Sequence, residues 1–115
     1  MKLYSPATIN EIKKKHGFKL SRSLGQNFLT DKNIIDKIIE KSMVGKGDLV
    51  LEIGPGIGVL TAAAAEAAGK VIAIEIDRGL IPILKETLRE YDNIEIINSD
   101  VLKTDLTAIL EQNRE

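Results

Sequence analysis

Residues 49–58 read Leu-Val-Leu-Glu-Ile-Gly-Pro-Gly-Ile-Gly and decide the fold class of this 115-residue chain. The apolar run predicts a buried strand, and the alanine-rich stretch after the three glycines predicts a helix. Glycine permits a sharp turn with no side chain in the way of a ligand, and a helix N-terminus offers amide donors to an anionic group. The stretch therefore predicts a strand, a tight loop and a helix that hold a nucleoside-bearing cofactor.

Strands and helices alternate from residue 48 to residue 115. The apolar pattern predicts strands at 49–53, 71–76 and 94–97 and helices at 59–68, 80–88 and 106–115. Right-handed crossovers place the strands in the order 3-2-1 of a parallel sheet, which is half of a doubly wound α/β fold. Because the first strand should be central and here has one open edge, we expect an incomplete domain, or a dimer that covers this edge.

Two helices are predicted before the sheet. The first starts at Ser5-Pro6, which suits a helix N-terminus, and ends at Gly17, and a loop is predicted at 18–29. The apolar residues of the second helix share one stripe that we expect to be buried: Ile34, Ile35, Ile38, Ile39 and Met43. These two helices precede the α/β part of the chain.

Charge is divided unevenly along the chain. Residues 1–46 carry ten Lys or Arg and four Asp or Glu, whereas residues 47–115 carry six and thirteen. We therefore divide the chain into a helical, basic arm at 1–46 and the first half of a cofactor-binding domain at 47–115. A basic arm beside an acidic body suggests a polyanionic partner such as nucleic acid, and a solvated lysine-rich surface explains the composition equally well.

The composition excludes several kinds of site. The chain has no cysteine, so it has neither disulfides nor thiolate-zinc sites, and His16 is its only histidine. No metal site is expected. No apolar run approaches the roughly 20 residues of a membrane helix, and nothing resembles a signal peptide, so we expect a cytoplasmic protein without a membrane partner.

Three carboxylates are predicted at the carboxyl ends of the three strands. Glu52 precedes the glycines, Glu75 ends the second strand and Asp100 follows the third. A carboxylate at the place of Glu75 can accept both ribose hydroxyls, and one at the place of Asp100 can accept an adenine amine. We expect all three to face one crevice. Asp100 and Asp77 could instead cap the next helices, and Glu52 could bind loop amides.

The glycine spacing separates two classes of cofactor. The dinucleotide fingerprint G-x-G-x-x-G requires glycine at position 59, where this chain has Val59. The observed pattern, an acid two residues before G-x-G-x-G, resembles the motif of S-adenosylmethionine-dependent methyltransferases. An NAD-binding dehydrogenase domain would share Glu75 and stays an alternative, which the glycine spacing and Asp100 disfavour.

Longer motifs carry a more specific resemblance. Residues 24–31 read Leu-Gly-Gln-Asn-Phe-Leu-Thr-Asp and residues 52–61 read Glu-Ile-Gly-Pro-Gly-Ile-Gly-Val-Leu-Thr. Together with 74–77 and 98–101, they resemble the ribosomal RNA dimethyladenosine transferases over essentially all of residues 16–105. The erythromycin-resistance methyltransferases, which act on large-subunit RNA, are closely similar, and the small-subunit enzymes fit these motifs better. The resemblance implies the N-terminal half of a Rossmann-like methyltransferase sheet.

The resemblance also implies S-adenosyl-L-methionine as the cofactor. Asn27 and the backbone of Leu29 would hold its methionine end, and Gly54 would pass close beneath it. Glu75 would bind the ribose. The adenine would lie among the remaining three residues of the implied site: Ile76, Asp100 and Val101.

The family dimethylates two adjacent adenosines near the 3′ end of small-subunit ribosomal RNA, in the pre-30S particle. With this context we expect RNA backbone contacts from the basic residues before the Gln-Asn-Phe-Leu motif: Lys13, Lys14, Lys15, Lys19 and Arg22. The family's catalytic Asn-Leu-Pro-Tyr motif is absent from these 115 residues, so we expect no catalytic residue and no activity from this chain alone. A large-subunit RNA methyltransferase and a non-catalytic cofactor-binding fragment stay alternatives.

Overall fold

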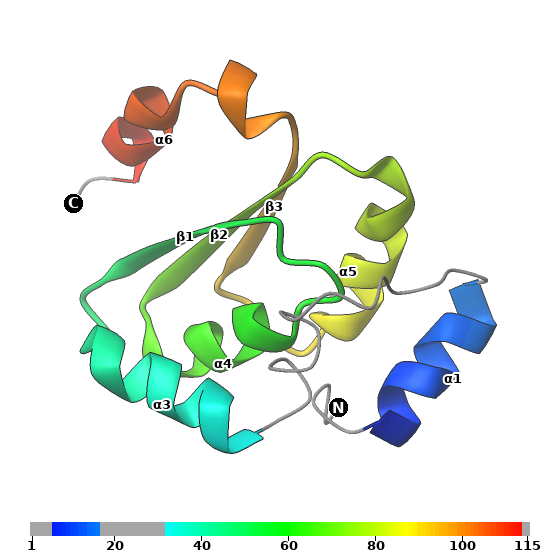
Figure 1. The fold of residues 1–115 in the computed structure, drawn as a ribbon. Coiled ribbons are helices and arrows are strands. Elements are labelled where there is room, and N and C mark those ends of the chain that lie inside the picture. Colours follow the sequence, from blue (N-terminus) through cyan, green and yellow to red (C-terminus); the bar gives the residue numbers. More distant parts are fainter. Residues whose placement is uncertain (1–5, 17–31, 114–115) are drawn as a thin grey trace.

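The computed structural model describes residues 6–16 and 32–113. Figure 1 shows one sheet with α4 and α5 on one side and α6 on the other. The order of the elements is α1 (Pro6–His16), α3 (Lys32–Ser42), β1 (Leu49–Ile53), α4 (Val59–Ala67), β2 (Lys70–Glu75), α5 (Ile81–Thr87), β3 (Ile94–Asn98) and α6 (Leu106–Gln112). Short 3-10 turns at Arg78–Leu80 and Val101–Lys103 follow β2 and β3. This arrangement confirms the predicted α/β class.

The three described strands form one parallel sheet in the order β1-β2-β3, which confirms the predicted order 3-2-1. Val71 pairs with Val50 on one side and with Ile94 on the other. All residues of β2 after Lys70 are buried, as is typical of the interior strand of a parallel sheet. The register places the carboxyl ends of the strands at one edge of the sheet, where the glycine loop begins.

The core lies between the sheet and the two helices that cover one of its faces. Small side chains let α4 approach β2 closely, and Ala64 and Ala65 pack with Val71. Ile35 of α3 packs into a second part of this core, with Leu84 among its neighbours. Burial of these aliphatic side chains stabilises the face that supports the glycine loop.

Several elements begin or end one or more residues away from the sequence prediction, and two of these differences bear on the buried stripe and the site. Helix α3 ends at Ser42, whose hydroxyl donates to the Ile39 carbonyl oxygen at 2.6 Å. Met43 then adopts a φ of 57° and is 87% exposed, and Ile38 is 44% exposed, so the predicted places of these two residues in the buried stripe are wrong. Strand β2 runs one residue earlier than predicted, and Ile76 lies beyond it, 64% exposed. The exposure of Ile76 matters for the site below.

The two helices before the sheet are present where the sequence predicts them. Helix α1 ends at His16, and the segment predicted to form the loop at 18–29 lies outside the described residues. The division of the chain at residue 46 stays a prediction. None of the helices within 6–16 and 32–113 is long and apolar enough to cross a membrane.

Candidate cofactor-binding site

Three glycines with left-handed backbone conformations join β1 to α4. Gly54, Gly56 and Gly58 have φ values of 70°, 63° and 95°, which side-chain-bearing residues rarely adopt. The amide of Gly54 donates to the carbonyl oxygen of Ile74 at 2.9 Å, which ties the loop to the end of β2. The amide of Gly58 donates to the Pro55 carbonyl oxygen at 3.0 Å, which closes the turn before α4.

The glycines serve two different purposes. A Cβ atom added at Gly54 or Gly56 would meet no heavy atom within 4 Å, whereas one at Gly58 would lie 3.0 Å from Cδ2 of Leu88. Gly58 is therefore needed for packing against the end of α5. Gly54 and Gly56 leave bare main chain beside the N-terminus of α4, and this surface fits a cofactor that approaches the backbone closely.

Glu75 ends β2 next to this loop. Its side chain is nearly buried, at 5% exposure, and its Oε2 atom accepts the Asp77 amide at 3.0 Å. Asn98, which the sequence reasoning missed, donates from Nδ2 to the Glu75 carbonyl oxygen at 2.8 Å and so fastens the ends of β2 and β3 together. The carboxylate is thus held at a fixed place, with hydrogen-bonding capacity left for a ligand hydroxyl.

Asp77 and Asp100 occupy equivalent places after β2 and β3. The Oδ1 atom of Asp77 accepts the amide of Gly79 at 2.8 Å, and that of Asp100 accepts the amide of Leu102 at 2.9 Å. The predicted alternative, that these residues cap the turns that follow them, is therefore confirmed. Capping uses one carboxylate oxygen, so the same side chain can also accept from a ligand.

Aliphatic side chains lie at the same edge of the sheet. Ile76 is exposed just beyond β2, and Val101 is half-buried just beyond Asp100. The pairing of Glu75 with Asn98 brings these two segments together. Exposed aliphatic surface beside fixed carboxylates is typical of a site for a flat, polar-edged ring such as a nucleobase.

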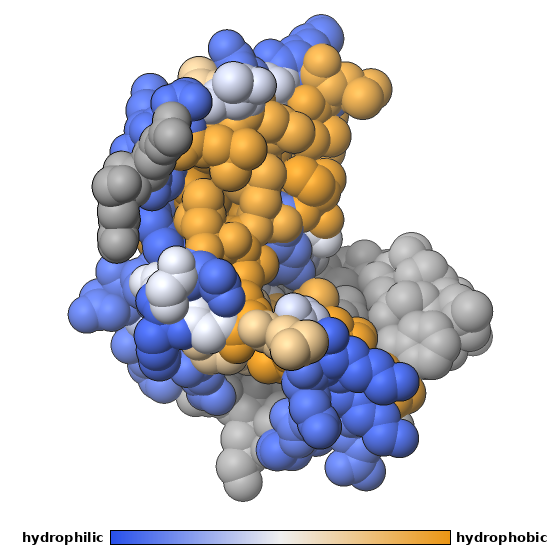
Figure 2. Space-filling model, turned by 90° about the vertical axis from the view of Figure 1, so that its left-hand side faces the viewer, coloured by the Kyte–Doolittle hydropathy of each residue, from blue (hydrophilic) through white to orange (hydrophobic). Residues whose placement is uncertain are grey.

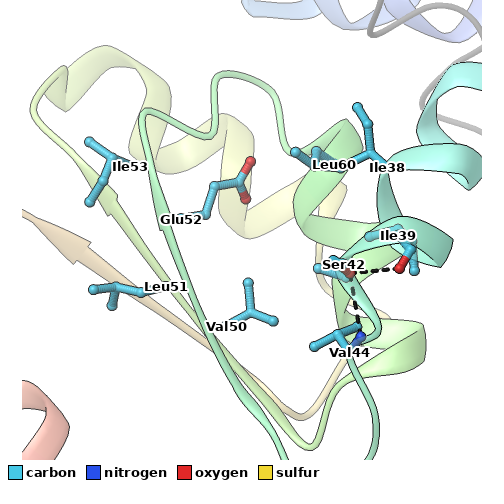
Figure 3. A pocket seen from close by; sticks show the side chains of 10 residues that line it. Ile38, Ile39, Ser42, Val44, Val50, Leu51, Glu52, Ile53 and Leu60 are labelled. Atoms are coloured by element: carbon cyan, nitrogen blue, oxygen red, sulfur yellow. Dashed lines mark hydrogen bonds between the residues drawn. The ribbon is translucent and has the colours of Figure 1, made fainter.

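The sequence prediction that Glu52 faces the same crevice as Glu75 and Asp100 is wrong. The Glu52 carboxylate lines an apolar pocket of about 280 Å³ between β1, α3 and α4, with Ile38 and Leu60 among the other lining residues (Figure 3). The fully buried hydroxyl of Thr61 donates to its Oε1 atom, so the predicted alternative of loop amides is wrong as well. Burial raises the pKa of Glu52, and the hydrogen bond from Thr61 opposes part of this rise.

Thr61 holds Glu52 in place, and the sequence reasoning gave Thr61 no role. It is the one hydroxyl-bearing residue in the otherwise apolar first turns of α4, which was a usable signal. Its hydrogen bond links the last part of β1 to the helix on the other side of the glycine loop. Both ends of the loop are thereby fixed, independently of the bonds made by the glycines.

The residues predicted to contact RNA are described only in part. Lys13, Lys14 and Lys15 belong to α1, where Lys14 and Lys15 are exposed. The Lys15 ammonium forms an ion pair with Glu86 of α5, which attaches α1 to the body of the protein. Four further predicted site residues lie outside the described residues: Lys19, Arg22, Asn27 and Leu29.

Comparison with known proteins agrees with this geometry. The sequence model of the protein family described as "Ribosomal RNA adenine dimethylase" matches residues 17–115. The chain belongs to this family. Its three parallel strands match part of the Rossmann-like fold of S-adenosylmethionine-dependent methyltransferases. The family resemblance seen in the sequence motifs is therefore confirmed.

One relative shows how much of a full-length family member this chain covers. Ribosomal RNA small subunit methyltransferase A of Alkaliphilus oremlandii is 54% identical over 111 residues, which are 96% of this chain and 39% of the relative. The chain thus spans about two fifths of that protein.

Two solved structures are each similar to about two thirds of the chain. A dimethyladenosine transferase from Plasmodium falciparum is 39% identical with a TM-score of 0.60, over 65% of this chain and 28% of that one. The 23S rRNA methyltransferase ErmE is 39% identical with a TM-score of 0.62, over 65% and 31%. The likeness therefore includes enzymes named for different RNAs.

Proposed function

We propose that this chain is the cofactor-binding half of an S-adenosyl-L-methionine-dependent methyltransferase. The enzyme would dimethylate two adjacent adenosines near the 3′ end of small-subunit ribosomal RNA, in the pre-30S particle of the cytoplasm. The main support is the bare main chain at Gly54 and Gly56 beside the nearly buried carboxylate of Glu75. Because a Cβ atom at either glycine would meet no heavy atom within 4 Å, the main chain there has room for a ligand.

The polar residues of the site would orient the cofactor. Glu75 would accept the ribose hydroxyls, and Asp100 would accept the adenine amine through the oxygen that does not cap the turn at Leu102. Gly54 would pass beneath the methionine end, where Asn27 and Leu29 are also proposed to bind. When bound, the cofactor supplies an activated methyl group, and the protein's task is to orient it.

The apolar residues would complete the site for the adenine ring. Ile76 would pack on one face of the ring, because it is exposed directly beyond Glu75. Val101 would lie beside the ring, since it follows the proposed amine acceptor. A carboxylate for the exocyclic amine favours an amine-bearing base such as adenine over a base with a carbonyl oxygen at that place, and aliphatic contacts suit the faces of its ring.

The small-subunit substrate is proposed from the named relatives. Ribosomal RNA small subunit methyltransferase A of Alkaliphilus oremlandii is 54% identical to this chain, whereas ErmE, named for 23S rRNA, is 39% identical. Lys13, Lys14, Lys15, Lys19 and Arg22 would contact the RNA backbone. The large-subunit alternative predicts methylation of free 23S rRNA by a protein that contains this segment, and the small-subunit proposal predicts methylation of pre-30S particles instead.

The cofactor proposal is tested by titrating the chain with S-adenosylhomocysteine and, separately, with NAD⁺, and by following backbone amide signals by NMR. We expect weak binding of S-adenosylhomocysteine, with shifts at Gly54, Gly56, Ile76 and Val101, and no such shifts with NAD⁺. Glu75→Gln removes the charge that accepts the ribose hydroxyls, which should weaken binding about tenfold.

A matched control is Glu95→Gln, because Glu95 is an exposed carboxylate on β3 away from the loop. This variant should bind as the unaltered chain does. Shifts that are equally strong with NAD⁺, or binding that is unaffected by Glu75→Gln, would contradict the proposal. No methylation of small subunits is expected from the chain alone.

A further inference from the structure

The two edges of the sheet differ in chemical character. Figure 2 shows a broad hydrophobic surface on the side of the molecule where β1 is the edge strand. The opposite edge strand, β3, ends at Asn98, and Ser99 and Asp100 follow it, so three consecutive polar residues stand there. Asp100 is the proposed acceptor for the adenine amine. The hydrogen bonds made by its neighbours therefore bear on where that acceptor lies.

Two half-buried hydroxyl groups bond to each other beside Asp100. The Oγ atom of Ser99 and the Oγ1 atom of Thr104 lie 2.8 Å apart, and the Thr104 hydroxyl donates to the Asp100 carbonyl oxygen at 2.6 Å. A hydroxyl has one proton to donate, so Ser99 is the donor within the pair. Its own contact with the Asp100 carbonyl oxygen is longer, at 3.4 Å. The two side chains thus form a short chain of hydrogen bonds that ends on the main chain of Asp100, and the bonds of such a chain strengthen one another.

Main-chain hydrogen bonds close the turn that ends at Thr104. The Lys103 amide donates to the Asp100 carbonyl oxygen at 2.9 Å, and the Thr104 amide donates to the Val101 carbonyl oxygen at 3.2 Å. These bonds need no side-chain hydroxyl, so the turn should form without the two hydroxyl groups. What the hydroxyl groups add is a link from the main chain of Asp100 back to Ser99, directly after β3.

Ser99 is also tied to Glu75, the proposed ribose acceptor. The Ser99 amide donates to the Glu75 carbonyl oxygen at 3.1 Å. The same oxygen accepts from Nδ2 of Asn98, which also lies 3.3 Å from the Ile76 carbonyl oxygen. Ser99 is therefore bonded through its amide to Glu75 and through its hydroxyl, by way of Thr104, to the residue after it. The end of β2 and the turn after β3 are connected at this one residue.

We propose that Ser99 and Thr104 are positioning residues, which set the place of the Asp100 carboxylate relative to that of Glu75. This inference rests on the proposed function, in which these two carboxylates accept from the amine and the ribose hydroxyls of one ligand. The rings of a bound nucleoside hold these groups at a set spacing, so the protein must hold its two acceptors at a matching spacing. Without the hydroxyl pair the turn keeps its main-chain bonds, but the Asp100 carboxylate is held less closely in register with Glu75.

The test compares S-adenosylhomocysteine with S-inosylhomocysteine, in which a carbonyl oxygen replaces the adenine amine. Both ligands keep the ribose hydroxyls, so the ratio of their affinities reports on Asp100 and not on Glu75. By NMR titration we expect the unaltered chain to bind S-adenosylhomocysteine about tenfold more tightly. Thr104→Val keeps the shape of the side chain but has no hydroxyl, and it should reduce this preference to about threefold or less. Ser99→Ala should act in the same direction.

Two further variants separate positioning from a general loss of structure. Thr104→Ser keeps a hydroxyl at the same place and should restore the preference. Thr107→Val is the matched control, because Thr107 is an exposed threonine on α6, and it should leave both affinities unchanged. Equal weakening of both ligands in Thr104→Val, or an unchanged preference in that variant, would overturn the proposal. If the unaltered chain has no preference, the proposed function fails and this inference fails with it.

Hydrogen exchange gives a second readout that needs no ligand. The Leu102 amide donates to the Asp100 carboxylate, so its exchange rate reports how firmly that carboxylate is held. We expect faster exchange at Leu102 in Thr104→Val than in the unaltered chain, and no change in Thr107→Val. The same exchange rate at Leu102 in both variants would overturn the proposal, whatever the affinity for the two ligands.

Discussion

Glu52 connects two elements through one hydrogen bond in a largely apolar setting. Its carboxylate accepts from Thr61 and lines the pocket at the open edge of β1. Burial raises its pKa above the ordinary value of 4.5. A group with a raised folded-state pKa contributes stability that is fully present below the unfolded-state pKa and is lost as the pH rises through the folded-state pKa. Ionisation of Glu52 therefore costs stability at neutral pH.

Glu52→Gln should remove this pH dependence. A glutamine oxygen can still accept from Thr61, and no charge is buried at any pH. We expect the variant to be at least as stable as the unaltered chain at pH 7, with no advantage near pH 4.5, in urea unfolding followed by circular dichroism. As a control, Thr61→Val removes the donor and should cost about 1–3 kcal/mol at neutral pH. A loss of stability in Glu52→Gln at both pH values would contradict this account.

The sequence predicts some residues of the site and misses others for a physical reason. The sequence predicts that Glu75 and Asp100 lie at one edge of the sheet because each stands at or just after the end of a strand. This prediction needs only the alternation of strands and helices along the chain. The orientation of Glu52 depends on how α4 packs against β1, which no local pattern specifies. The same holds for Asn98, whose role follows from the pairing of β2 with β3.

The glycine loop combines two kinds of constraint within one element. At Gly56 only the backbone conformation excludes a side chain, whereas at Gly58 a Cβ would also meet Leu84 and Leu88. The sequence alone predicts a loop there, because three glycines follow an apolar run. It does not separate the glycine that serves packing from those that leave the main chain open, since the neighbours come from α5, about thirty residues later.

Alanine at the two positions should therefore have different effects on stability. Gly56→Ala should cost about 1–2 kcal/mol, the usual penalty of a left-handed conformation. Gly58→Ala should cost about 1–3 kcal/mol more, because its Cβ would lie 3.0 Å from Leu88 and the core would have to shift. Urea unfolding of both variants measures the difference, and equal losses would show that the packing at Gly58 is unimportant.

Element boundaries were predicted less well than the elements themselves. Helix α3 was expected to include Met43, but the hydroxyl of Ser42 bonds back to the chain and the next residue turns out of the helix. Strand β2 is shifted by one residue because Lys70 is the register partner of Leu49. In both cases a hydrogen bond or a neighbouring strand, and not hydrophobicity, determines where the element ends.

At the scale of the whole molecule, the sheet is asymmetric. Strand β3 and the turn after it form one edge, and β1, the strand that leads into the glycine loop, forms the other. The open edge was predicted from the strand order alone, whereas the apolar pocket beside it depends on where α3 packs. The proposed cofactor site is thus next to the open edge of β1.

The central claim is that a nucleoside cofactor lies over the glycine loop, between the ends of β1, β2 and β3. The most direct measurement is a crystal structure of the chain with S-adenosylhomocysteine bound. We predict ribose hydroxyls on the Glu75 carboxylate, the adenine amine on Asp100 and the ligand backbone against Gly54. A ligand bound elsewhere, or one that leaves Glu75 and Asp100 without contact to it, would contradict the account.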